Sequence, residues 1–236
     1  MTQKPEKLSW LALLPIAATL GFYGLPSSVQ HYRIVQFLPQ ILAYLSIGMW
    51  VRHNTHFWTR FGLIPERLWA GIGWGCLTGL LLGICNTLVI LWVGPVWGGD
   101  ISFLKHTPHA QVPILIMVPW GILGIAIFVE FNFRGFLLGR LASLFSVTTD
   151  RQNGNHPWPE RPGMSPGLAA AIGTSSLVFA FDPFMVATFR HLHWIAVWDG
   201  LIWGWMRIRL GNLYAVITAH TLEVVILYLW IKAALT

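Results

Sequence analysis

A glutamate and an arginine lie inside an apolar stretch of the chain that is long enough to cross a membrane. The stretch starts near Val112, fades near Phe145 and contains Glu130 and Arg134. Four residues apart on a helix, the two side chains share one face and can form an ion pair. Because charges inside a bilayer are energetically costly, they are kept there by pairing, by a cavity or by chemistry.

Two roles for this pair follow. In the first, it is a structural ion pair that holds two helices together. In the second, Glu130 is a general base, since a carboxylate in a site of low dielectric constant is suited to proton abstraction near neutral pH. Arg134 would then orient Glu130 or bind a carbonyl or carboxylate of a substrate.

Two further ionisable residues are expected at a similar depth in the membrane. At a rise of about 1.5 Å per helical residue, Glu130 lies about 15 Å from the inner end of its span, and Asp199 and His220 about 12 Å. Three groups on three helices at one depth indicate a shared site better than any one of them. The alternative for His220 is a hydrogen bond across helices without chemistry. Glu223 is expected one turn deeper.

The composition is that of a polytopic membrane protein. Of the 236 residues, 55% are hydrophobic and 10% are charged, whereas a soluble domain carries about 25% charged residues. We therefore expect an all-α polytopic transmembrane helical bundle of about seven to eight helices. The net charge of +6 is typical of membrane loops, and the absence of a basic run argues against a nucleic-acid partner.

Seven apolar segments are expected to cross the bilayer, and connectors rich in proline and glycine separate them. Ten Lys and Arg fall on the side of the N-terminus and four on the other, which with Arg134 makes the 15 of the chain. This bias predicts an N-terminus inside and a C-terminus outside the cell. The segments are approximately 8–25, 34–51, 68–96, 112–138, 167–184, 194–206 and 213–234.

Three motifs in the second half of the chain resemble those of the CPBP family, the type II CAAX prenyl endopeptidases and the bacterial glutamic intramembrane proteases related to them. The resemblance covers about residues 113–235 and includes the order, spacing and helix context of the motifs. It is closest to the bacterial branch, which implies a bacterial cytoplasmic membrane. The matching residues are Glu130, Phe133 to Leu137, Ser175 to Ala180, Gly204 to Arg209, Gly211 to Leu213, and Ala219-His220.

The first and third motifs of the family are matched in part. The first is two adjacent glutamates followed, after three residues, by an arginine. Glu130 and Arg134 match the second glutamate and the arginine, and Val129 takes the place of the first glutamate, which is the stronger candidate base in the family. The third is His-x-x-x-Asn, where His220 matches and Val224 replaces the asparagine.

The second motif, Phe-x-x-x-His, is displaced. Counted from Phe179, the histidine position falls on Pro183, and the pattern is met only ten residues later, by His193. Either an insertion has moved the histidine, or Asp182 replaces it, or the function is lost. His193 is expected near the outer surface, so a helix must break and re-enter to bring it to the site; otherwise Asp182 or Asp199 completes the site.

The resemblance implies an intramembrane endopeptidase in which a glutamate activates water and histidines hold the water or the oxyanion. Glu130 would be the base, His220 and His193 would bind water or oxyanion, and Arg134 would hold Glu130 in place. No cofactor is expected, although two histidines and a glutamate can bind zinc. The expected partners are the lipid bilayer and a membrane-anchored protein or peptide substrate.

The expected organisation is one integral membrane domain. It consists of N-terminal transmembrane helices in residues 1–112 and a CPBP-like catalytic core in residues 113–236. Two other functions are compatible with the sequence. The Val129 and Val224 departures favour a catalytically degraded member that acts as a membrane scaffold or binds a partner. Alternatively, Glu130, Asp199 and His220 relay protons or ions in a small transporter.

Overall fold

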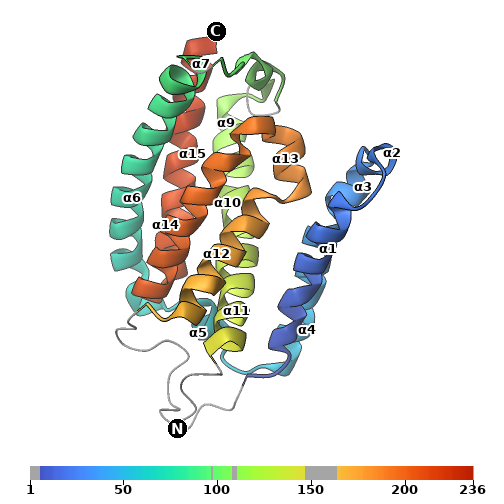
Figure 1. Ribbon diagram of the computed structural model, residues 1–236. Helices are drawn as coiled ribbons and strands as arrows, with labels where there is room; N and C mark the ends of the chain where they lie inside the picture. Colours follow the sequence, from blue (N-terminus) through green and yellow to red (C-terminus); the bar gives the residue numbers. More distant parts are fainter. Residues whose placement is uncertain (1–5, 97, 108–110, 147–163, 236) are drawn as a thin grey trace.

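The computed structural model describes the chain except residues 1–5, 97, 108–110, 147–163 and 236. The described residues form helices and contain no strand, so the predicted all-α class is confirmed. Helices from distant parts of the chain run roughly along one axis (Figure 1). The start of the first helix and the end of the last lie at opposite ends of the molecule (Figure 1).

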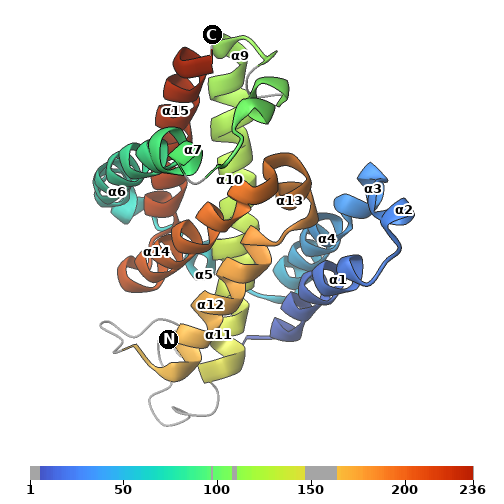
Figure 2. The ribbon, with the colours of Figure 1, turned by 45° about the horizontal axis from the view of Figure 1, so that its top comes forward.

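An N-terminal helical hairpin flanks the rest of the bundle on one side (Figures 1 and 2). The Gln40 amide of its second long helix donates to Asp182 Oδ1 (3.0 Å), and the Tyr44 hydroxyl donates to the Phe128 carbonyl (3.0 Å). These bonds join the hairpin to the helices that hold the predicted site. Its elements are η1 (Ser9–Ala12), α1 (Leu13–Tyr23), α2 (Ser27–Gln30), α3 (Arg33–Gln36) and α4 (Leu38–His53).

The opposite side of the bundle is a pair of long helices, α6 (Leu68–Leu88) and α15 (Leu213–Leu235), which lie side by side (Figures 1 and 2). Every fourth residue of α6 from Gly71 to Gly83 is a buried glycine. A Cβ atom at Gly79 would lie 2.5 Å from the carbonyl oxygen of Ala219. Only glycine therefore permits this close approach, as in other membrane helix pairs with small residues four apart.

Short elements connect α4 to α6 and follow α6. Before α6 come α5 (Phe57–Phe61) and the 3₁₀ turn η2 (Pro65–Arg67). After it come the π-helical turn η3 (Val89–Val93), α7 (Gly94–Val96) and η4 (Ser102–His106).

The central helix contains Glu130 and is interrupted twice by π-helical turns, in which hydrogen bonds run five residues back instead of four. Such turns often occur at functional sites. The second of them begins directly after Glu130. The segments are α9 (Ile114–Ile116), the π-helix η5 (Met117–Gly124), α10 (Ile125–Glu130), the π-helix η6 (Phe131–Leu137) and α11 (Leu138–Ser146).

The next helix is broken into two segments that differ in direction. α12 (Pro166–Ala180) and α13 (Pro183–Phe189) each begin with proline at a first-turn position, where its missing N–H is no loss. The axes of the two helices differ by 52°. The 3₁₀ turn η7 (Arg190–Trp194) then leads to α14 (Ile195–Leu210), which ends at Gly211 with φ +59°.

Fewer helical stretches qualify as candidate membrane spans than were predicted from the sequence. Among the described residues, three helical stretches are long and apolar enough to cross a bilayer, or four if α12 and α13 together form one span. The expected count of seven to eight is not confirmed. A span needs about 20 residues, whereas α1 has 11 residues and α4 and α14 have 16 each.

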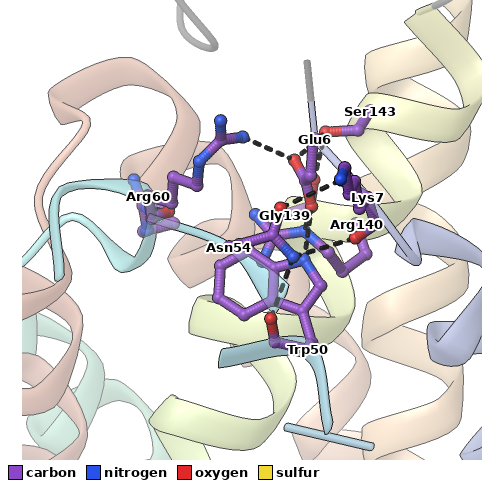
Figure 3. Close-up of polar contacts among 9 residues, drawn as sticks. Glu6, Lys7, Trp50, Asn54, Arg60, Gly139, Arg140 and Ser143 are labelled. Carbon is purple, nitrogen blue, oxygen red and sulfur yellow. Dashed lines mark hydrogen bonds and ion pairs between the residues drawn. The ribbon is translucent and has the colours of Figure 1, made fainter. Parts of the chain in front are cut away.

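A buried polar cluster ties the N-terminal segment to the ends of three helices (Figure 3). Glu6 forms ion pairs with Arg60 (3.2 Å) and with Arg140, and it accepts hydrogen bonds from Trp50 Nε1 (2.9 Å) and Ser143 Oγ (3.0 Å). The side chain of Arg140 is 2% exposed. Glu6 thus links α4, α5 and α11 at one end of the bundle.

Candidate active site

Glu130 and His220 meet in the interior of the bundle. The Glu130 side chain is completely buried, and its Oε1 atom lies 2.7 Å from His220 Nδ1 and 3.3 Å from Arg134 Nη1. The predicted contacts of Glu130 with Arg134 and with His220 are both present. The His220 imidazole, 90 residues further along the chain, and the Arg134 guanidinium therefore meet at one oxygen atom of Glu130.

The π-helical turn η6 positions Arg134 relative to Glu130. The Phe133 carbonyl in this turn accepts a hydrogen bond from Ser175 Oγ of α12 (2.9 Å). Gly135 faces Phe61, where a Cβ atom would lie 2.4 Å from the ring. The turn is therefore held on one side by a hydrogen bond and on the other by close packing.

Aromatic rings surround the charged groups. The Arg134 guanidinium lies 4.3 Å from the centroid of the Phe179 ring and 5.1 Å from that of Trp203. The His220 ring stacks on Trp203, with the centroids 4.5 Å apart and the planes 23° from parallel. These rings cover one side of the centre and favour a cation there.

Two polar atoms of the centre have no hydrogen-bond partner among the described residues. They are Glu130 Oε2 and Arg134 Nη2, and both are buried. A buried polar group without a partner costs about 1–3 kcal/mol, so such groups persist where function needs them. Glu130 Oε2 can accept a proton, and Arg134 Nη2 can donate a hydrogen bond to a nearby oxygen.

A second polar group adjoins this centre. Asn86 Nδ2 of α6 donates to Asp199 Oδ1 (3.0 Å) and to Glu223 Oε1 (2.6 Å). Glu223 follows His220 by three residues on α15 and so adjoins the centre. The expectation that Asp199 shares the site of Glu130 and His220 stays a prediction.

Sequence reasoning missed Asn86. The sequence feature that could have revealed it is a single amide side chain in an apolar span, three residues after Gly83, the last of the buried glycines spaced four residues apart. These glycines face α15, the helix that contains both His220 and Glu223.

His193 and Asp182 make their contacts elsewhere. His193 lies in η7, where its Nδ1 atom contacts the Arg190 carbonyl and its ring packs edge-on against Phe181 with centroids 5.1 Å apart. Asp182 caps α13 by accepting from the backbone N–H groups of Phe184 (3.1 Å) and Met185 (3.4 Å). Asp182 lies at the break between α12 and α13, and the His193 ring packs against Phe181 there; a role for His193 in catalysis stays a prediction.

The centre is enclosed. A surface groove of about 450 Å³ between α6 and α14 is lined by Trp74, Trp205 and Met206, among others, and not by Glu130 or His220. A second groove lies near η3 and η7. Among the described residues, no three His, Cys, Asp or Glu side chains are grouped so that they could hold a metal ion, and the cofactor expectation stays a prediction.

Comparison with known proteins supports the family predicted from the motifs. Residues 111–226 match the family model described as type II CAAX prenyl endopeptidase Rce1-like. No curated protein and no solved structure matches the chain. The matched region contains Glu130, Arg134 and His220. This match agrees with the order and spacing of the motifs, and residues 111–226 of the chain are therefore similar to the Rce1-like family of type II CAAX prenyl endopeptidases.

Proposed function

We propose that the protein is an intramembrane endopeptidase in which Glu130 activates a water molecule against a peptide bond of a membrane-associated substrate. The observation that carries this proposal is the asymmetry of the Glu130 carboxylate. Its Oε1 atom is held by Arg134 and His220, while Oε2 accepts no hydrogen bond from a described residue. A carboxylate anchored in this way presents one oxygen as a base.

The first step is the attack of water on the substrate carbonyl. Glu130 Oε2 takes one proton from the water as the new carbon–oxygen bond forms. Charge then develops on the former carbonyl oxygen, and a donor fixed in a dry site stabilises it. Arg134 Nη2 is such a donor, and the Phe179 and Trp203 rings hold the guanidinium in place.

The second step breaks the carbon–nitrogen bond. The electron pair of that bond goes to the nitrogen, which takes up a proton and leaves as an amine, and the other product is a carboxylic acid. His220 keeps Glu130 oriented through the Nδ1–Oε1 contact during both steps. The reaction consumes one water molecule, and the one proton that the nitrogen takes up balances the one that Glu130 removes from the water.

The substrate class follows from the position of the centre. Glu130 lies in an apolar stretch, Ile114–Phe145, that is long enough to span a membrane. A peptide that reaches it must be anchored in or near the bilayer. We propose that the N-terminus lies inside the cell, because the Lys and Arg bias favours that orientation. The resemblance of the motifs to the bacterial branch of the family supports a bacterial cytoplasmic membrane as the location.

The test is Glu130→Gln in cells that process membrane-anchored proteins through this enzyme. Glutamine keeps the Oε1 acceptor for Arg134 but cannot accept a proton, so we expect cleavage to fall by about 100-fold or more. Glu66→Gln is the matched control, since Glu66 is exposed in η2. Undiminished cleavage by Glu130→Gln would exclude Glu130 as the base.

A scaffold function is the second candidate. It is favoured by Val129 and Val224, which replace two polar positions of the family motifs, and by the enclosed centre. A scaffold predicts that no membrane protein accumulates unprocessed when the gene is deleted. It also predicts that Glu130→Gln and wild type restore partner binding equally.

A further inference from the structure

Two more buried carboxyl groups meet one helical turn from the Glu130 centre. Asp199 precedes Trp203 by four residues on α14, and Glu223 follows His220 by three on α15. Since α14 and α15 run in opposite directions (Figure 1), the stack of Trp203 on His220 and the pair of Asp199 with Glu223 form successive rungs, about 5 Å apart. The two carboxyl side chains are 4% and 3% exposed.

The amide of Asn86 fixes the geometry of the Asp199–Glu223 pair. Its Oδ1 atom accepts a hydrogen bond from Trp198 Nε1 (3.0 Å), which turns Nδ2 toward the acids. Nδ2 then contacts Asp199 Oδ1 (3.0 Å), Asp199 Oδ2 (3.2 Å) and Glu223 Oε1 (2.6 Å). An amide that presents hydrogens to both acids cannot act as a ligand to a metal cation between them.

The two acids are close enough to each other for a proton to be shared. Asp199 Oδ1 and Glu223 Oε1 both lie within hydrogen-bond distance of one nitrogen atom, Asn86 Nδ2, so the two carboxyl groups lie side by side. Glu223 Oε2 is buried and has no hydrogen-bond partner among the described residues. Two buried carboxyl groups this close together do not both remain ionised, as in the carboxyl dyads of other hydrolases, and a carboxyl group that keeps its proton can donate it to the other.

We propose that Asp199 and Glu223 share one exchangeable proton and supply it to the amine that leaves from the Glu130 centre. The second part rests on the proposed peptidase function. In this scheme Glu130 takes a proton from water, and Glu223 gives its proton to the nitrogen as the carbon–nitrogen bond breaks. The proton on Glu130 then returns to the pair, so that both groups are restored after each turnover.

The shared proton is tested without substrate by infrared spectroscopy of the purified full-length protein in lipid nanodiscs. The wild type should show a carboxylic-acid carbonyl band at neutral pH that shifts in heavy water. Glu223→Gln should lose this band, and Asp199→Asn should shift its frequency, because the acceptor changes from a carboxylate to an amide. Glu130→Gln and Glu66→Gln should keep the band.

The donor role is tested by the processing assay used for Glu130. We expect Glu223→Gln to lower the cleavage rate by about 100-fold and Glu223→Asp to recover part of it, because aspartate can still hold a proton. Melting temperature, followed by the fluorescence of the protein, identifies any variant that fails to fold. If Glu223→Gln fails to fold, the frequency shift in Asp199→Asn decides the first part and the cleavage rate of Glu223→Asp the second.

The outcomes separate the two proposals. A wild type without the exchangeable band, or a Glu223→Gln variant that keeps it, overturns the shared proton. Cleavage by Glu223→Gln at the wild-type rate overturns the donor role and leaves Glu130 to protonate the amine itself. If Glu130→Gln cleaves like the wild type, the proposed function and the donor role fail together, while the infrared result still decides the shared proton.

Discussion

The close approach of α6 to α15 allows the effect of one substitution, Gly79→Ala, to be worked out from the structure. The Gly79→Ala substitution places a methyl group 2.5 Å from the carbonyl oxygen and 2.9 Å from the Cα atom of Ala219. Ordinary contact at this position begins at 3.4 Å, so α15 must move away by about 1 Å, because its backbone cannot yield as a side chain does. Ala219 directly precedes His220, whose contact with Glu130 is 2.7 Å long.

Two effects follow from this displacement. Overpacking of a close helix contact costs about 1–3 kcal/mol of stability. A displacement of about 1 Å in a catalytic group can reduce activity by about 100-fold. We therefore expect Gly79→Ala to lower both the melting temperature and the cleavage rate.

The assay compares Gly79→Ala with Gly73→Ala on the same helix. A Cβ atom at Gly73 meets nothing within 4 Å, so this variant should keep the stability and activity of the wild type, or gain a little from the better helix propensity of alanine. Melting temperature in detergent and cleavage in cells are measured for both. Equal behaviour of the two variants would refute the argument that α6 holds His220 in position.

Two other substitutions test the charged groups. Glu6→Gln should destabilise the protein by about 3–5 kcal/mol, because it leaves the buried Arg140 without the carboxylate it pairs with; chemical denaturation measures this, and a midpoint equal to that of the wild type would contradict it. Arg134→Lys keeps the charge but loses the flat contacts with Phe179 and Trp203, which are worth about 0.5–2 kcal/mol. Cleavage should therefore fall about tenfold at an unchanged expression level, and full activity of the lysine variant would show that only the charge matters.

Much of the site could be predicted from local patterns. Glu130 and Arg134 are four residues apart on one helix, so their contact depends on helical periodicity alone. The position of His220 was predicted from its depth, which depends only on the rise per residue. Both predictions concern distances along a helix axis, and these hardly vary from one protein to another.

The partners of the site across helices could not be predicted in the same way. The sequence left Asp182, Asp199 and His193 open as the group that completes the site. Asp182 lies at the break between α12 and α13, where the His193 ring packs against Phe181, and Asp199 joins Asn86 and Glu223. Which faces of two helices meet depends on their rotation and crossing, and these are determined by packing over the whole contact.

The sequence by itself determined that this is an all-helical membrane protein with an acid, an arginine and a histidine at one depth. Hydrophobicity and helical periodicity are local properties, and each can be read from a single segment. Only the tertiary structure decided that Asn86 bridges two acids and that these acids lie beside the centre. Those features arise where α6, α14 and α15 pack together, and the glycine stripe that permits the closest contact acts through neighbours that are distant in the chain.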